Sequence, residues 1–242
     1  MFFVRHTVRK QFSIVIPAYN EEESILLLYD AIKEARLKQD YEIIFINDGS
    51  TDNTQEVLEQ LYRKDKDLKV INFRKNLGKT AAWLAGFKQA RGDVIITLDA
   101  DLQNDPSDIP KLLHKVKQGY DAVNGWRYKR EDPLTQKIPS LIFNWLARKI
   151  TGIELDDINC GFKAFRRDAV KNLPSREGMH RYILIILFFR GLKIKEIRVK
   201  HHARRFGKSK YSFGRLFKGM IDLILIVRVI KNPKTFKRFI YP

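Results

Sequence analysis

The chain has 242 residues, 44% of them hydrophobic, and a formal net charge of +18. This apolar content excludes a disordered chain, and the length suits an α/β domain with a substantial core. The single cysteine, Cys160, excludes an intramolecular disulfide and fits a reducing compartment.

The first 118 residues alternate between short apolar runs and segments with helical patterning. We expect strands at 12–17, 41–47, 68–73 and 93–98, and helices at 21–37, 52–64, 79–90 and 108–118. This alternation predicts βαβ units and a mostly parallel, Rossmann-like α/β sheet with helices on both faces. Ligands of such sheets bind beyond the carboxyl ends of the strands, where several polar motifs lie.

After residue 118 the alternation becomes irregular. We expect strands at 121–126, 161–165 and 194–201, and helices near 141–150, at 182–189 and at 211–229. The helix at 182–189 is strongly apolar, which predicts a buried position or one that faces an interface.

Residues 189–242 carry most of the positive charge, with sixteen Lys or Arg against two acidic residues, a net +14. Because apolar residues are interleaved with these cations, the segment suits a polyanion such as nucleic acid or an anionic bilayer. Its most apolar part, 220–230, contains Asp222 and Arg228 and is shorter than the roughly 20 apolar residues of a membrane span.

The helix expected at 211–229 has apolar residues at three- and four-residue spacing: Phe213, Leu216, Phe217, Met220, Ile221, Ile224 and Val227. This spacing predicts an amphipathic helix that lies in the headgroup plane of a membrane. The alternative is that the same residues pack on the domain as core.

Asp99 and Asp101 flank Ala100 directly after the fourth expected strand. In a turn just past a strand end, both carboxylates can converge on one cation. Mg²⁺ and Mn²⁺ prefer oxygen ligands and share them with a diphosphate, whose leaving charge they neutralise. We therefore expect a divalent ion at Asp99 and Asp101, with Gln103 as a further candidate ligand; the alternative is a turn or helix cap.

The loops that follow the first two strands are also polar, at 17–22 and 47–52. Part of this pattern is explained by helix N-caps and by acids in the first helical turn. Beyond that, Asp48 could accept the ring N–H of uracil or guanine, and Tyr19 could pack on the base or ribose. The candidate residues for binding a nucleotide are Pro17, Tyr19, Glu21, Asp48, Asp52, Lys79, Asp99 and Ala100.

In their order and spacing, four motifs resemble those of glycosyltransferase family 2: IPAYNEE (16–22), NDGSTD (47–52), NLGK (76–79) and LDADLQ (98–103). The resemblance implies a GT-A fold and inverting transfer from a UDP- or GDP-sugar. Downstream motifs resemble the polyprenyl-phosphate sugar synthases, such as dolichyl-phosphate mannose synthase: GWR (125–127), DxxCGFKxFR (157–166), ExMHR (177–181) and RxxGxSKY (204–211).

The chain departs from relatives of that type in one respect. Many bacterial members carry two transmembrane helices after the catalytic domain, and this sequence has none at that place. It also lacks the Gln-x-x-Arg-Trp motif of processive polysaccharide synthases, which argues against polymerisation.

The cations of the second half favour a phosphate acceptor. A sugar hydroxyl needs a general base, whereas a phosphate monoester already carries about −1.5 to −2 charges and needs cations to hold it. The candidate acceptor residues are Arg127, Arg130, Lys137, Arg204, Ser209 and Lys210. The candidate catalytic residues are Asp101, Asp157 and Arg127.

Two alternatives remain open. In one, the acceptor is a glycan or lipid-sugar hydroxyl and Asp157 is the base. In the other, the chain is a non-enzymatic basic protein that binds membranes or nucleic acid.

We expect a GT-A catalytic domain at 1–210 and a basic amphipathic segment at 211–242. The expected partners are a nucleotide-sugar, polyprenyl phosphate and an anionic membrane surface, and no nucleic acid. The expected location is the cytoplasmic face of a membrane, peripherally, either unaided or anchored by a C-terminal segment beyond this chain. The sugar, the nucleotide, the metal and the oligomeric state stay open.

Overall fold

A computed structural model of the chain describes residues 10–130, 134–206 and 213–232. Its strands are β1 (Phe12–Ala18), β2 (Tyr41–Asn47), β3 (Leu68–Asn72), β4 (Val94–Thr97), β5 (Ala122–Trp126), β6 (Lys163–Arg166) and β7 (Ile194–Arg198). Its α-helices are α1 (Ile25–Glu34), α2 (Thr54–Lys64), α3 (Lys79–Gln89), α4 (Ile109–Lys117), α5 (Leu134–Thr151), α6 (Ile183–Phe189) and α7 (Phe213–Lys231). Short 3₁₀ turns lie at Pro106–Asp108, Arg167–Val170 and Met179–Arg181.

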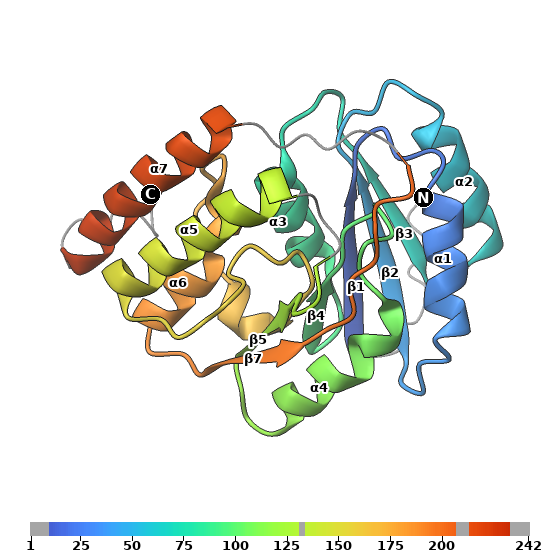
Figure 1. Cartoon of the computed structure of the whole chain (residues 1–242). Helices are drawn as coiled ribbons and strands as arrows, with labels where there is room; N and C mark the ends of the chain where they lie inside the picture. Colours follow the sequence, from blue (N-terminus) through green and yellow to red (C-terminus); the bar gives the residue numbers. More distant parts are fainter. Residues whose placement is uncertain (1–9, 131–133, 207–212, 233–242) are drawn as a thin grey trace.

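The strands form one sheet in the order β3-β2-β1-β4-β6-β5-β7 (Figure 1). The first four strands are mutually parallel, and β5 pairs with β7 in parallel. In the described chain, only β6 is reversed, between β4 and β5. The predicted mostly parallel sheet is confirmed. The reversal was not predicted, because strand direction depends on how the chain returns across the sheet, which a residue pattern does not encode.

The element boundaries differ in places from those expected. The first helix begins at Ile25, not at residue 21, because residues 22–24 form a turn that precedes it. The same helix ends at Glu34, just before Arg36 adopts a positive φ of 44°. The last expected strand ends at Arg198, and His201 forms an isolated bridge with Asn104 instead.

Two apolar layers cover the sheet, because side chains alternate between its faces. On β1, Ile14 and Ile16 pack with helices α1, α2 and α4, while Val15 faces α3 on the opposite side. Helices α5, α6 and α7 belong to the same layer as α3 (Figure 1).

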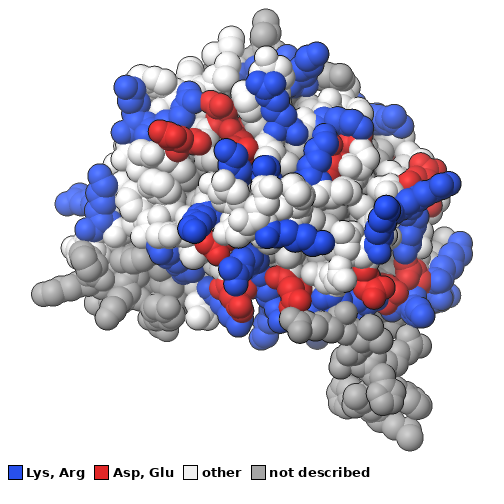
Figure 2. Space-filling view, turned by 90° about the horizontal axis from the view of Figure 1, so that it is seen from below, with Lys and Arg blue, Asp and Glu red and all other residues white. Residues whose placement is uncertain are grey.

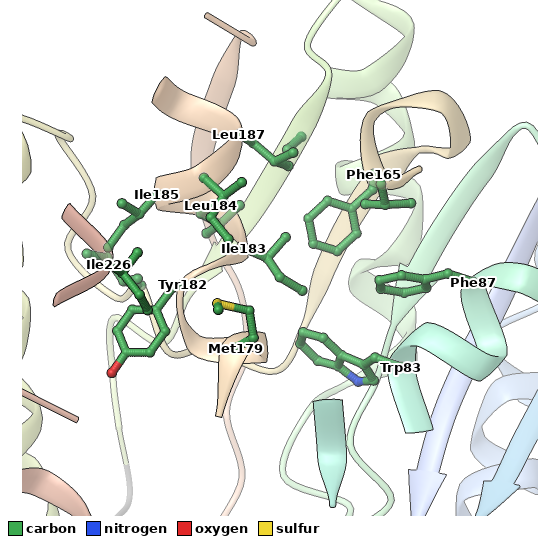
Figure 3. Close-up of a cluster of buried hydrophobic side chains, with 14 of the residues drawn as sticks. Trp83, Phe87, Phe165, Met179, Tyr182, Ile183, Leu184, Ile185, Leu187 and Ile226 are labelled. Carbon is green, nitrogen blue, oxygen red and sulfur yellow. The ribbon is translucent and has the colours of Figure 1, made fainter. Parts of the chain in front are cut away.

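Helix α6 is the apolar helix expected at 182–189, and it is buried. All residues from Ile183 to Leu187 are nearly inaccessible to solvent. Figure 3 shows Ile183 of this helix beside Met179, Trp83 and Phe165, which come from the preceding turn, α3 and β6. This cluster therefore holds the 177–182 segment against α3.

Helix α7 packs its inner face on the domain. Its buried residues are Leu223, Ile226, Val227 and Ile230, whereas Ile221, Ile224 and Leu225 are exposed. The expectation that Met220, Ile221, Ile224 and Val227 share one membrane-facing stripe is therefore wrong: Val227 lies in the core and Met220 packs against it. The side chains of Phe213, Leu216 and Phe217 lie outside the description, as does the predicted domain boundary at 210/211. None of the described helices is long and apolar enough to cross a membrane.

Candidate active site

A cleft of about 480 Å³ opens at the carboxyl ends of β1, β2 and β4. One wall comes from the loops after these strands and the start of α3. The other wall comes from 177–181, Arg204 and Asp222. The lining residues from the strand ends and α3 are Pro17, Ala18, Tyr19, Glu21, Asp48, Asn76, Gly78, Lys79, Asp99, Ala100 and Asp101.

The loops after β1 and β2 meet because Ala18 and Asn47 are paired in register. Asn20, in a left-handed conformation (φ 56°), accepts a hydrogen bond from the Thr51 backbone N–H (2.8 Å). Asp52 accepts bonds from the backbone N–H groups of Thr54 (3.0 Å) and Glu22 (3.3 Å). Asp52 thus braces the two loops, and it does not line the cleft.

Asp48 is almost fully buried at the end of β2, and its carboxylate holds the turn that leads into α3. It accepts hydrogen bonds from the backbone N–H groups of Leu77 (2.7 Å) and Gly78 (2.9 Å). Gly78 has a φ of 87°, which favours glycine. Through these bonds Asp48 positions Lys79, the next residue along the chain. A contact between Asp48 and a base stays a prediction.

Asp99 and Asp101 lie side by side in the cleft, each with a basic partner. Lys79 Nζ lies 2.6 Å from Asp99 Oδ1, and Arg204 donates to Asp101 Oδ2. Burial raises the pKa of Asp101, and the negative charge of Asp99 raises it further. Burial opposes the ionisation of Asp99 as well, but Lys79 holds the pKa of Asp99 below its usual value.

This donor set fits a hard divalent cation that is shared with a diphosphate. The two carboxylates repel each other at low solvation, and a cation between them would relieve that repulsion. Among the described residues, no group of three His, Cys, Asp or Glu converges on a metal position. The remaining ligands would then be diphosphate oxygens and water, as is usual for Mg²⁺. Gln103 is not part of the cleft wall, and its side-chain amide lies 3.5 Å from the His202 carbonyl.

Arg127 and Asp157 form a buried two-point ion pair beside the cleft. Arg127 Nε and Nη2 lie 2.6 and 2.8 Å from the two carboxylate oxygens. Burial would raise the pKa of Asp157, but Arg127 lowers it below the usual value. Neither residue lines the cleft. Asp157 is therefore an ionised group that orients Arg127.

The profile of glycosyl transferase family 2 matches residues 13–173, more than half of the chain. The chain belongs to glycosyl transferase family 2. It is 42% identical over 218 residues to the undecaprenyl-phosphate 4-deoxy-4-formamido-L-arabinose transferases of Photorhabdus laumondii and Yersinia pestis. These alignments cover 89% of this chain and 67% of each relative.

The fold is similar to that of glucosyl-3-phosphoglycerate synthase from Mycobacterium tuberculosis, solved with Mn²⁺ and UDP-glucose. The TM-score is 0.71 at 21% identity, and the match covers 90% of this chain and 79% of the other. Another structure of that synthase, with Mn²⁺, UDP and glucosyl-3-phosphoglycerate, has a TM-score of 0.67 at 19% identity and covers 96% and 80%. The GT-A fold expected for family 2 is confirmed.

The predicted acceptor residues of this family 2 chain are only partly brought together. Arg204 lines the cleft. Arg130 instead donates to the Ser140 hydroxyl (2.8 Å) in α5, and Lys137 lies on α5, away from the cleft wall. Ser209 and Lys210 lie outside the described residues.

Four residues of the second wall are not predicted from the sequence: Glu177, His180, Arg181 and Asp222. The first three belong to the ExMHR motif, which resembles the polyprenyl-phosphate sugar synthases but does not by itself indicate which of its residues face a cleft. Asp222 was considered only as a charge that interrupts an apolar run. Its place in an otherwise apolar helix was the available signal.

His180 is fixed to the start of α3. Its backbone N–H donates to the Thr80 hydroxyl (3.2 Å), and its Nδ1 lies 2.9 Å from the same oxygen. The ring packs edge-on against Trp83, with centroids 5.9 Å apart. Burial, helped by Lys79 and Arg181, lowers the pKa of His180 well below its usual value, so the ring is neutral at pH 7.

Proposed function

We propose that this family 2 glycosyltransferase transfers a sugar, with inversion, from a nucleotide-sugar to polyprenyl phosphate at a membrane surface. The observation that carries the proposal is the pair Asp99 and Asp101 in one cleft, each balanced by a cation. The two relatives named above, at 42% identity, are transferases named for undecaprenyl phosphate.

Asp99 and Asp101 would hold Mg²⁺ or Mn²⁺, which supplies positive charge to the leaving nucleoside diphosphate. Lys79 and Arg204 border the same position and add charge for phosphate oxygens. The loops with Tyr19 and Asp48 lie on the nucleoside side. The sugar would then project toward the wall with Glu177 and His180.

A phosphate acceptor suits this cleft because it needs no general base. Asp157 is the residue expected to serve as base for a hydroxyl acceptor, and both of its oxygens are engaged by Arg127. Its lowered pKa also makes it a weak base. We therefore assign Asp157 to holding Arg127 near the incoming phosphate.

The outer faces of α5 and α7 support attachment to a bilayer. The two helices pack side by side (Figure 1). Together they expose seven large apolar residues, between 42% and 63% accessible, which we call the α5–α7 surface: Ile138, Leu141, Ile142, Trp145, Ile221, Ile224 and Leu225. Arg148, Lys149, Arg228 and Lys231 occupy the last turns of the same helices. Each cation near an anionic leaflet contributes about 1 kcal/mol.

The α5–α7 surface is connected to the cleft through α7, because Asp222 lines the cleft while Ile221 and Ile224 face outward. A lipid phosphate at headgroup depth would thus lie near the second wall. On the face that Figure 2 shows, Asp and Glu side chains lie among the Lys and Arg side chains. That face therefore offers no uniformly basic surface to a polyanion.

A donor screen tests the proposed function. Purified protein, undecaprenyl phosphate and Mn²⁺ or Mg²⁺ would be incubated with UDP- and GDP-sugars, and the organic phase analysed for glycosylated lipid. We expect one donor to give a lipid product whose anomeric configuration is opposite to that of the donor. No lipid product from any donor, by a protein that binds nucleotide, would contradict the proposal.

Flotation with anionic vesicles tests the membrane part separately. We expect Ile221→Glu with Ile224→Glu to weaken flotation and lipid glycosylation together. Leu26→Glu with Leu27→Glu is the matched control, since these exposed apolar residues lie on α1, in the opposite helix layer. Equal flotation of both double variants would place the membrane contact elsewhere.

A further inference from the structure

Three polar residues lie side by side across neighbouring strands beneath the cleft. Asn124 of β5 is paired in register with Lys163 of β6 and with Glu196 of β7. Lys163 and Asn124 are at most 1% exposed, and Glu196 is partly buried. We call these three residues the buried row.

The buried row is joined by short hydrogen bonds. Lys163 Nζ donates to Asn124 Oδ1 (2.7 Å), and Asn124 Nδ2 donates to Glu196 Oε1 (2.8 Å). The hydrogen-bond acceptors of the buried Lys163 ammonium group are neutral oxygens and not a carboxylate. Burial of its positive charge therefore costs free energy that no opposite charge in a hydrogen bond offsets. Burial accordingly lowers the pKa of Lys163 to about 8.

The remaining bonds of the row all go to one loop, residues 156–161. Lys163 Nζ donates to the carbonyls of Ile158 (2.9 Å) and Cys160. Asn124 Nδ2 also donates to the Asp157 carbonyl (2.9 Å). Glu196 accepts from the backbone N–H groups of Asp156 (2.8 Å) and Asp157 (3.0 Å). The row therefore anchors the loop backbone at four residues: Asp156, Asp157, Ile158 and Cys160.

Both ends of this loop touch residues of the proposed reaction. At one end, Asp157 holds Arg127. At the other end, Gly161 lies against the Asp99 carboxylate so closely that an added Cβ would be 2.1 Å from Oδ2. The Gly161 carbonyl also accepts from the Thr97 hydroxyl (2.8 Å), two residues before Asp99.

We infer that Lys163, Asn124 and Glu196 are positioning residues, which place Asp99 for the donor side and Arg127 for the acceptor side through the 156–161 loop. The inference rests on the proposed function, because the roles of Asp99 and Arg127 come from it. One set of buried residues, which contacts neither the donor nor the acceptor, would thus position a residue for each of them.

The positive charge of Lys163 also supports the proposed roles of Asp99 and Asp157. Among the charged groups around it are Asp157, Arg127 and Lys79, and its positive charge favours the ionised forms of Asp99 and Asp157. Both carboxylates must be ionised for their proposed roles, one to bind a cation and the other to hold Arg127.

Glu196→Gln tests the inference with a nearly isosteric change. It turns one acceptor oxygen into an NH₂ group that faces a backbone N–H or Asn124 Nδ2, so the loop must shift. Glu42→Gln is the control: Glu42 is a buried glutamate on β2, remote from the cleft, that accepts the Arg91 backbone N–H (2.6 Å) and the Ser13 hydroxyl (2.7 Å) and also pairs with Lys69. Asn124→Asp is a second variant, which keeps the acceptor for Lys163 and loses the two donors.

Two quantities are measured below the unfolding temperature of each variant. The first is Mn²⁺ affinity, determined by electron paramagnetic resonance with UDP and, separately, with GDP. The second is the KM for undecaprenyl phosphate. We expect Glu196→Gln and Asn124→Asp to weaken Mn²⁺ binding and to raise KM, each by roughly 10-fold, the low end for residues that orient metal ligands. Glu42→Gln should lower the unfolding temperature and change neither quantity.

Wild-type values of both quantities in Glu196→Gln and Asn124→Asp would reduce the buried row to a purely structural role. This result is distinct from failure of the proposed function, in which the wild-type protein itself would glycosylate no polyprenyl phosphate. The Mn²⁺ measurement decides the inference for Asp99 even then, because it requires no turnover.

Discussion

Asp99 and Asp157 are both carboxylates with a basic partner, yet their surroundings differ. Asp99 has a single lysine contact, and 27% of its side chain is accessible from the cleft. Asp157 is only 3% exposed, and both of its oxygens are bonded to Arg127. Asp99 can therefore exchange its lysine partner for a ligand, whereas both oxygens of Asp157 are already bonded to Arg127. Residue type and a nearby cation do not by themselves distinguish a ligand-binding carboxylate from one that holds another side chain.

The largest effect should come from the open carboxylates. Asp101→Ala removes a proposed metal ligand and leaves Arg204 without its partner, so transfer should fall by roughly 10²- to 10³-fold while the fold persists. Excess EDTA should abolish wild-type transfer, and added Mn²⁺ or Mg²⁺ should restore it. Full turnover in EDTA would remove the metal from the account.

Gly161→Ala should displace the Asp99 carboxylate without changing any ligand. The added Cβ would clash with Asp99 Oδ2, and we expect metal affinity to fall by about 10- to 100-fold. Gly86→Ala is the control, because its Cβ would meet Val15 at 2.4 Å in the core, away from the metal position. If both variants lose stability and neither changes metal affinity, the close approach of Gly161 has no bearing on the site.

The wall of the cleft built from the strand ends could be predicted from the sequence, because its residues follow consecutive parallel strands. Asp48, Lys79, Asp99 and Asp101 converge as expected once the strands are adjacent. The second wall could not be predicted, since Glu177, Arg204 and Asp222 come from separate segments. The burial of Lys163 depends on the place of β6 between β4 and β5 in the sheet, and a lysine in a short strand is equally typical of an exposed face.

Asp157→Asn tests the role of the buried carboxylate that is bonded to Arg127 through both oxygens. Breaking a buried ion pair at one partner costs about 3–5 kcal/mol, so the unfolding temperature should fall clearly. If Asp157 only holds Arg127, the KM for undecaprenyl phosphate should rise by about 10-fold and turnover should persist at low temperature. Loss of all turnover with intact donor binding would instead identify Asp157 as the base for a hydroxyl acceptor.

The smallest effect concerns His180, whose lowered pKa links stability to pH. Unfolded histidine takes up a proton near pH 6.5, while folded His180 stays neutral to lower pH. The unfolded state therefore gains protons first, and stability should fall as the pH drops below 6.5, by at most about 1.4 kcal/mol per pH unit. Denaturant titrations between pH 7 and 5 should give a shallower slope for His180→Gln, and an unchanged slope would assign the loss to other groups.

In the proposed reaction, the acceptor is a phosphate held by cations and not an activated hydroxyl. The direct measurement compares sugar incorporation into undecaprenyl phosphate and into undecaprenol, which differ only in the phosphate, with the same donor, metal and detergent. We predict incorporation into undecaprenyl phosphate and none above background into undecaprenol. Equal incorporation into both lipids, or incorporation into undecaprenol alone, would contradict the account.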